Sequence, residues 1–145
     1  MYDSVLIPTD GSEMIDTTLE HGLRIARDHG ATVHALYVVD SRVARAAEDA
    51  RESVEESLRA EGEEAIDHVV ARAEEEGLEA VGEVRSGTPQ KEIVEYAEEA
   101  GIGLIAIGTH GKSPREKLLS MGSVTERVVD NAPVPVLVVR DPDQP

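Results

Sequence analysis

Leu104-Ile105-Ala106-Ile107 is an unbroken apolar run, and the turn residues Gly108-Thr109-His110-Gly111 follow it directly. A strand without polar residues on either face needs cover on both, which is typical of a parallel sheet between helices. Four more β-branched runs recur along the chain: Ser4 to Ile7, Thr32 to Val39, Ala80 to Val84 and Val134 to Val139. Because segments of helical periodicity separate these runs, the sequence predicts an α/β fold with an open, doubly wound sheet of five parallel strands.

The length of 145 residues is that of one domain. We expect a single domain over residues 1–141 and a frayed polar tail over 142–145. There are 30 acidic residues against 14 Lys and Arg, and a formal charge of −16 disfavours nucleic acid and anionic membranes as partners. Cysteine is absent, and no apolar run approaches the roughly 18 residues that span a bilayer. These features predict a cytoplasmic protein.

The acid excess comes with only 3 Lys against 11 Arg and with no Phe or Trp. Such a surface is tolerable where concentrated salt screens charge repulsion over a few Å. The composition therefore suggests a protein adapted to high salt.

Four helical segments are expected between the strands. The first begins at Ser12 or the residue after it and ends at His29, with Ser12 as candidate N-cap and Gly30 as its stop. The second, over 42–76, holds twelve of the thirty acidic residues, and a kink or break at Gly62 would fit the low helix propensity of glycine. Its acidic face is either simply solvated or a docking surface. The other two helices follow Gly87-Thr88-Pro89 and span Gly122 to Asn131.

Ligands of open parallel sheets bind beyond the carboxyl ends of the strands, where the strand order reverses. At that edge, Gly108 and Gly111 allow a tight turn or a close approach of the backbone to a ligand. The helix start Gly122-Ser123-Val124 offers unpaired amide groups and a positive dipole end, and Ser123 and Thr125 add hydroxyl groups. The plainer alternative is a turn followed by a capped helix.

Asp10 follows the first strand, and its carboxylate either contacts a ligand or caps the next helix. Asp40 is expected to cap the helix after the second strand. His110 lies in the glycine turn and is a candidate ligand neighbour. We expect the other four histidines, His21, His29, His34 and His68, to be structural.

Lys112, Arg115 and Lys117 form the densest basic cluster of the chain. They are either neighbours of a bound phosphate or solvated loop charges. No Ser-His-Asp order or metal-ligand spacing occurs, so the sequence does not indicate covalent or hydrolytic catalysis.

Taken together, these residues resemble the universal stress protein family, in its ATP-binding branch, over almost the whole chain. The matching stretches are Ile7-Pro8-Thr9-Asp10-Gly11-Ser12, Tyr37-Val38-Val39-Asp40, Gly87-Thr88-Pro89, Ile107 to Gly111, Gly122-Ser123-Val124-Thr125-Glu126 and Val134 to Val139. The resemblance implies strand order 3-2-1-4-5, a fold like that of the adenine nucleotide α-hydrolases, and a homodimer through the last strand, Val136 to Val139. With the composition, it suggests a halophilic archaeal source.

The resemblance also implies an ATP site, with Mg²⁺ or Mn²⁺ left open as a companion ion. Asp10 and the backbone of Val38 would contact adenine, glycines of the turn would line the ribose and phosphates, and the start of the last helix would hold the phosphates. The whole expected set is Pro8, Thr9, Asp10, Val38, Ile107, Gly108, Thr109, His110, Gly111, Gly122, Ser123, Val124 and Thr125.

One feature departs from the family's nucleotide pattern, G-x2-G-x9-G-[ST]. Ten residues, Lys112 to Met121, stand between Gly111 and Gly122, one more than the pattern has. Loops absorb insertions more easily than element ends do, so we expect a local bulge rather than a displaced phosphate site.

Two functions remain open at this point. The first is a dimeric stress-response or signalling module that binds ATP and has at most weak ATPase activity. The second is a dimeric adaptor of the same fold that binds no nucleotide and uses its acidic helix face for docking.

Overall fold

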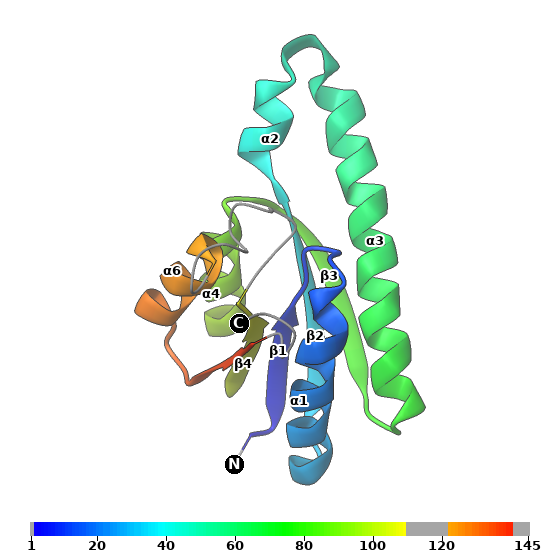
Figure 1. The fold of residues 1–145 in the computed structure, drawn as a ribbon, viewed down its shortest axis with the longest axis vertical. Coiled ribbons are helices and arrows are strands. Elements are labelled where there is room, and N and C mark those ends of the chain that lie inside the picture. The colour runs from blue at the N-terminus through cyan, green and yellow to red at the C-terminus, as the bar shows by residue number, and fades with distance from the viewer. Residues whose placement is uncertain (1, 110–121, 141–145) are drawn as a thin grey trace.

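The structure, a computed structural model, describes residues 2–109 and 122–140 (Figure 1). Its strands are β1 (Ser4–Pro8), β2 (Thr32–Asp40), β3 (Ala80–Gly87), β4 (Leu104–Gly108) and β5 (Val136–Val139). They form one parallel sheet in the order β3-β2-β1-β4-β5, which confirms the predicted fold and strand order. The helices are α1 (Met14–His29), α2 (Ser41–Ala46), the 3-10 turn η1 (Glu48–Ala50), α3 (Arg51–Glu75), α4 (Pro89–Glu99) and α6 (Ser123–Asn131). The predicted tail lies outside the described residues.

Helices cover both faces of the sheet (Figure 1). On one face, Leu19 and Leu23 of α1 and Val69 of α3 pack in one buried apolar cluster with sheet residues. On the other, Ile93 of α4 and Val128 of α6 belong to a second cluster. The unbroken apolar strands are thus buried from both sides, as their composition predicts. No described helix has the length and apolar character needed to cross a membrane.

The carboxyl edge of the sheet is stepped. Pairing of β1 with β2 ends at Pro8 and Leu36, but β2 runs on to Asp40 while still paired with β3. Pairing of β1 with β4 ends earlier still, at Leu6 and Ile105. The end of β1 therefore lies in a recess between two neighbouring strands, at the point where the strand order reverses.

Helix α1 begins later than the capping prediction has it. The carboxylate Oδ1 of Asp10 accepts a hydrogen bond from the Ser12 amide at 2.9 Å, which turns the chain before the helix. Glu13 is the N-cap and makes no side-chain cap bond, so the prediction of Ser12 as N-cap is wrong. The predicted stop is confirmed, since Gly30 adopts a left-handed conformation with φ 63°.

The long acidic segment breaks at a different place from the one considered. Helix α3 runs without interruption through Gly62, and the break lies at η1, where Glu48 has φ 50°. A Cβ atom at Gly62 would lie 2.4 Å from Cδ1 of Tyr37. Gly62 is therefore a packing residue that lets α3 lie against the ring of Tyr37, and not a hinge.

Candidate functional site

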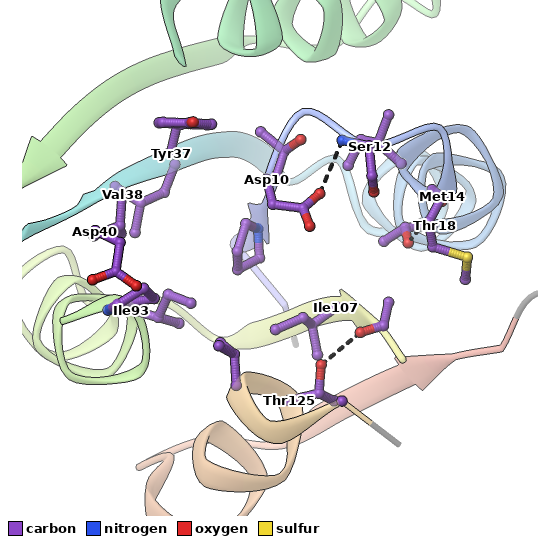
Figure 2. Close-up of a pocket in the computed structure, with 18 of the residues that line it drawn as sticks. Asp10, Ser12, Met14, Thr18, Tyr37, Val38, Asp40, Ile93, Ile107 and Thr125 are labelled. Carbon is purple, nitrogen blue, oxygen red and sulfur yellow. Dashed lines mark hydrogen bonds between the residues drawn. The ribbon is translucent and has the colours of Figure 1, made fainter. Parts of the chain in front are cut away.

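The described residues line an open cavity of about 440 Å³ above the end of β1 (Figure 2). Most of the predicted site residues line it: Pro8, Thr9, Asp10, Val38, Ile107, Gly108, Thr109, Gly122, Val124 and Thr125. Ser123, the first residue of α6, does not. His110 and Gly111 lie outside the described residues, as do the basic cluster and the ten-residue stretch that departs from the family pattern.

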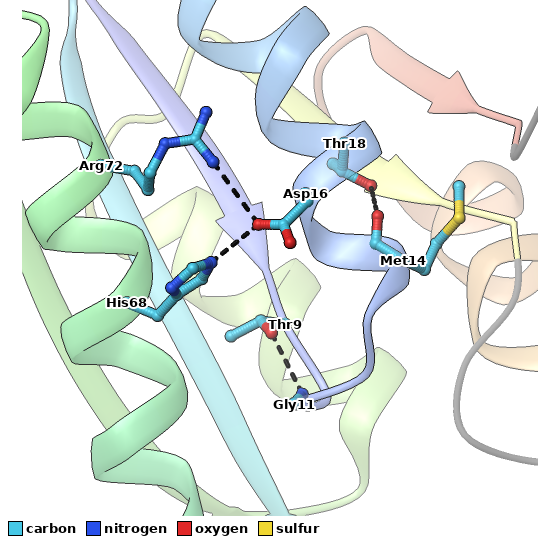
Figure 3. A network of polar contacts seen from close by, with 7 residues as sticks. All are labelled: Thr9, Gly11, Met14, Asp16, Thr18, His68 and Arg72. Atoms are coloured by element: carbon cyan, nitrogen blue, oxygen red, sulfur yellow. Dashed lines mark hydrogen bonds and ion pairs between the residues drawn. The ribbon is translucent and has the colours of Figure 1, made fainter.

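The loop between β1 and α1 is folded on its own side chains. The hydroxyl Oγ1 of Thr9 accepts a hydrogen bond from the Gly11 amide at 3.1 Å (Figure 3), and the Asp10 carboxylate accepts one from Ser12 (Figure 2). Gly11 has φ 82°, a conformation that glycine adopts without strain. The Asp10 side chain therefore orders the turn before α1 and lines the cavity, but it does not cap the helix itself.

The same loop leaves the peptide group of Val38 facing the cavity. Alternate residues of a strand direct their N–H and C=O groups to the same neighbour. The carbonyl of Leu36 accepts from the Thr9 amide at 2.9 Å, so Val38, two residues on, also faces the β1 side. If β1 continued, the Gly11 amide would donate to the Val38 carbonyl, but it donates to Thr9 Oγ1. Within the described loop residues, no backbone hydrogen bond reaches Val38.

The opposite end of the cavity is the junction of β4 and α6. The Thr125 hydroxyl donates to the Gly108 carbonyl at 2.6 Å (Figure 2), and the Gly122 amide donates to the Thr109 carbonyl at 2.5 Å. The expectation of an unpaired amide is therefore wrong for Gly122. The reason is that Thr109 pairs with β5 through its own amide, 3.0 Å from the Val139 carbonyl, and so holds its carbonyl beside the start of α6.

Thr109 also brings a buried hydroxyl group to this end of the cavity. The residue is 1% exposed, and its Oγ1 has no hydrogen-bond partner among the described residues. Leaving such a group unsatisfied costs about 1–3 kcal/mol. It lies on the wall that also includes Val124, in the first turn of α6, where helix amide groups lack intrahelical acceptors. This end of the cavity suits an anionic or hydrogen-bond-accepting group.

Asp40 lines the cavity but is engaged elsewhere. Its carboxylate caps α2, as predicted, by accepting from the Arg42 amide at 3.0 Å, and it pairs with the Arg42 guanidinium at 2.9 Å. The hydrogen bond from Arg42 is the main reason that the pKa of Asp40 lies below its usual value. Asp40 therefore remains ionised and serves the fold.

Several lining residues escaped the sequence analysis, and among the described ones Tyr37 is the one with an aromatic ring. It is 5% exposed, and burial, followed by the charge of Asp10, raises its pKa. Its place next to Val38 in the quoted stretch is the signal that would have found it. Met14, Ile15, Leu58 and Ile93 were also missed, because they look like ordinary core residues of helices.

An ion-pair cluster ties α1 to α3 beside the loop (Figure 3). Asp16 Oδ1 lies 2.8 Å from Nε2 of His68 and 3.5 Å from Nη1 of Arg72. All three side chains are at least a third exposed, so solvent screens these contacts and each stabilises the fold only weakly. Among the described residues, no group of three or more His, Asp or Glu side chains is arranged to hold a metal ion.

The model of the Universal stress protein family matches residues 1–140. Universal stress protein MJ0531 of Methanocaldococcus jannaschii is 44% identical over 98% of this chain and 84% of its own. The structure of protein MJ0577, from the same organism, has a TM-score of 0.88 at 31% identity and covers 99% of both chains.

A universal stress protein from Archaeoglobus fulgidus, solved in complex with dAMP, has a TM-score of 0.74 at 22% identity. The two chains are covered to 95% and 98%, and at this identity the likeness is one of fold. The family match, by contrast, extends over all five strands and both ends of the cavity. The chain belongs to the universal stress protein family.

Proposed function

We propose that this protein binds an adenine nucleotide, ATP among them, in the cavity above β1. It would act in the cytoplasm as a dimeric stress-response or signalling module with no or slow ATP hydrolysis. The observation that carries the proposal is the peptide group of Val38, which faces the cavity and forms no backbone hydrogen bond to the described β1–α1 loop.

A strand edge of this kind complements adenine. The Val38 N–H donates to N1 of the base, and its C=O accepts from the exocyclic N6 amino group. Asp10, which lines the same cavity, brings a second acceptor for an amino group. Guanine has an oxygen acceptor in place of the N6 amino group, and this oxygen would face acceptors on the protein. Adenine is therefore the favoured base.

The opposite end of the cavity supports a phosphate group. The start of α6 contributes amide donors and a positive dipole end, and Thr109 contributes a buried hydroxyl group. In the proposal, the residues expected from the family resemblance outside the described ranges, His110 and Gly111, complete this end. The dAMP complex of the Archaeoglobus fulgidus protein is a case of an adenine nucleotide bound by a protein of this fold.

Slow or absent hydrolysis follows from the described carboxylates. Of the carboxylates in the described part of the chain, Asp10 and Asp40 line the cavity, and Asp40 is held by Arg42, so Asp40 is poorly placed to orient an attacking water. A companion Mg²⁺ or Mn²⁺ would be held largely by the phosphates themselves.

Dimerisation would occur through β5, which is an edge strand of the sheet. Its residues Val136, Leu137 and Val138 are half-buried, and a second copy would cover them and pair the open edge. Light scattering of the purified protein tests this, since a monomer at micromolar concentration would contradict it. Adaptation to high salt predicts a melting temperature that rises with KCl, and no salt dependence would contradict that part.

Isothermal titration in high KCl tests nucleotide binding. Wild-type protein should bind ATP, with GTP about tenfold weaker or worse because its base leaves polar groups unpaired. Val38→Pro removes the N–H that faces the cavity and should abolish ATP binding while circular dichroism retains the α/β signature. Failure of the wild type to bind ATP would overturn the proposal and favour the adaptor function.

A further inference from the structure

Tyr37 has a hydroxyl group that the fold itself does not use. A buried tyrosine normally places its hydroxyl on a hydrogen-bond partner. Tyr96 does so, with its hydroxyl 2.8 Å from Nδ1 of His34. Tyr37 is 5% exposed and lines the cavity, and its hydroxyl forms no hydrogen bond to another described residue. The Tyr37 oxygen is not among the buried unpaired atoms of the described residues, so it is open to the cavity, where a molecule from outside the chain can pair with it.

The ring of Tyr37 is held in place from behind. Helix α3 approaches so closely at Gly62 that a Cβ atom there would lie 2.4 Å from Cδ1 and 2.9 Å from Cε1 of the ring. The glycine is kept inside a 25-residue helix although it costs about 1 kcal/mol relative to alanine. The ring therefore packs closely against α3 at Gly62, and this contact fixes its position at the cavity wall.

The hydroxyl is also kept as a donor by its surroundings. Figure 2 shows Tyr37 and Asp10 on the same side of the cavity, with Val38 next to Tyr37 on β2. Burial, and then the negative charge of Asp10, raise the pKa of Tyr37, so the phenol stays protonated through neutral and mildly alkaline solution. The Tyr37 hydroxyl, the Asp10 carboxylate and the Val38 peptide group together offer hydrogen-bond donors and acceptors that can recognise a heterocyclic base.

We propose that Tyr37 is a specificity-determining residue that donates a hydrogen bond from its hydroxyl to N7 of the bound purine. This inference rests on the proposed adenine site, in which Val38 takes N1 and N6. Because N7 is the next acceptor around the ring beside N6, it enters the cavity without water and needs a donor. Tyr37 supplies that donor.

A two-by-two titration isolates this bond. ATP and 7-deaza-ATP, in which a C–H group replaces N7, are titrated into the wild type and into Tyr37→Phe. In the wild type, 7-deaza-ATP should bind about three- to tenfold more weakly than ATP, the effect of one neutral hydrogen bond. In Tyr37→Phe, the two ligands should bind equally, both at the weaker level, and the melting temperature should match that of the wild type.

Thr109→Val serves as the matched control at the other end of the cavity. It should weaken both ligands by the same factor and keep the difference between them. If Tyr37→Phe lowers both affinities equally, or neither, while the wild type binds ATP, the N7 assignment is wrong and the adenine site stands. If the wild type binds neither ligand, the site and the inference fall together.

Discussion

Two peptide groups, those of Val38 and Gly108, lie on opposite sides of the recess above β1. Both lie on strands that flank β1, and both are beyond the point where β1 pairs with its neighbours. The Gly108 carbonyl is satisfied by the Thr125 hydroxyl at 2.6 Å, whereas Val38 receives no backbone hydrogen bond from the described loop. The reversal of strand order exposes such groups on both sides of β1. On the Gly108 side the hydroxyl of Thr125 pairs with the exposed carbonyl, and on the Val38 side the peptide group stays available to a ligand.

Proline at successive positions of β2 should give the largest difference. Val39 directs its N–H toward β3, so Val39→Pro removes a ladder hydrogen bond inside the core and should lower the free energy of unfolding by about 3 kcal/mol or more. Val38→Pro removes an N–H that the sheet does not use, and its cost should be much smaller. Urea unfolding of both variants without ligand measures the difference. Equal losses would mean that the Val38 amide is engaged in the fold.

Substitution of Thr125 should have the next largest effect on the free energy of unfolding, because its hydroxyl pairs with the Gly108 carbonyl. Thr125→Val keeps the shape but leaves the Gly108 carbonyl without its donor, for an expected loss of about 1–3 kcal/mol in the free energy of unfolding. Thr125→Ser keeps the hydroxyl and loses one buried methyl group, worth about 0.8 kcal/mol. Chemical denaturation of the apo protein compares them. A valine variant more stable than the serine variant would show that the hydroxyl does not serve the fold.

The two sides also differ in how far the sequence predicts them. The apolar strands are confirmed, because runs such as Leu104 to Ile107 favour a covered parallel sheet, and the strand order that the family resemblance implies is confirmed as well. The step in the sheet depends on how far β2 and β3 pair beyond β1, and no local pattern encodes it. For the same reason the pairing of the Gly122 amide with Thr109 was missed, since it joins residues brought together only by the tertiary fold.

The position of the break in the acidic segment also depends on tertiary contacts that the local sequence does not show. Residues 47–50 contain no glycine or proline, yet the chain turns there, and it runs straight through Gly62. Propensity ranks glycine as the weak point of a helix, but the contact with Tyr37 on β2 outweighs propensity. Tyr37 itself looks like one more residue of a β-strand until the cavity is seen.

Substitution at Gly62 tests the Val38 side of the recess, because a side chain there would displace the ring of Tyr37, the neighbour of Val38 on β2. Alanine should gain about 1 kcal/mol from helix propensity but lose about 1–3 kcal/mol from the clash with the ring, for a net loss near 1 kcal/mol. Ser57→Ala, at an exposed position of the same helix, is the control and should be neutral or slightly stabilising. Thermal unfolding of the two variants gives the comparison. A stabilised Gly62→Ala variant would show that the ring moves freely and is not fixed by this contact.

Thr109→Val should change stability by a similarly small amount, in the opposite direction. Its hydroxyl is buried and unpartnered among the described residues, so replacing it with a methyl group removes a desolvation penalty and should raise stability by about 1 kcal/mol, the lower end of that penalty. The affinity for ATP should nevertheless fall about three- to tenfold, with adenosine unaffected, because only the nucleotide has a phosphate at that end of the cavity. Thermal unfolding and titration of both ligands measure the two effects.

A gain in stability together with a loss of phosphate-dependent affinity is what separates a group kept for a ligand from one kept for the fold. Thr125 and Thr109 make this distinction within one junction, since both are buried threonines at the end of β4 and the start of α6. The first donates to the chain, and the second has no partner in the described part of it. If Thr109→Val instead lost stability and bound ATP normally, the hydroxyl would serve the fold. The described hydroxyl groups at the Gly108 side would then all pair within the chain. Only the Val38 side would then remain to hold a ligand.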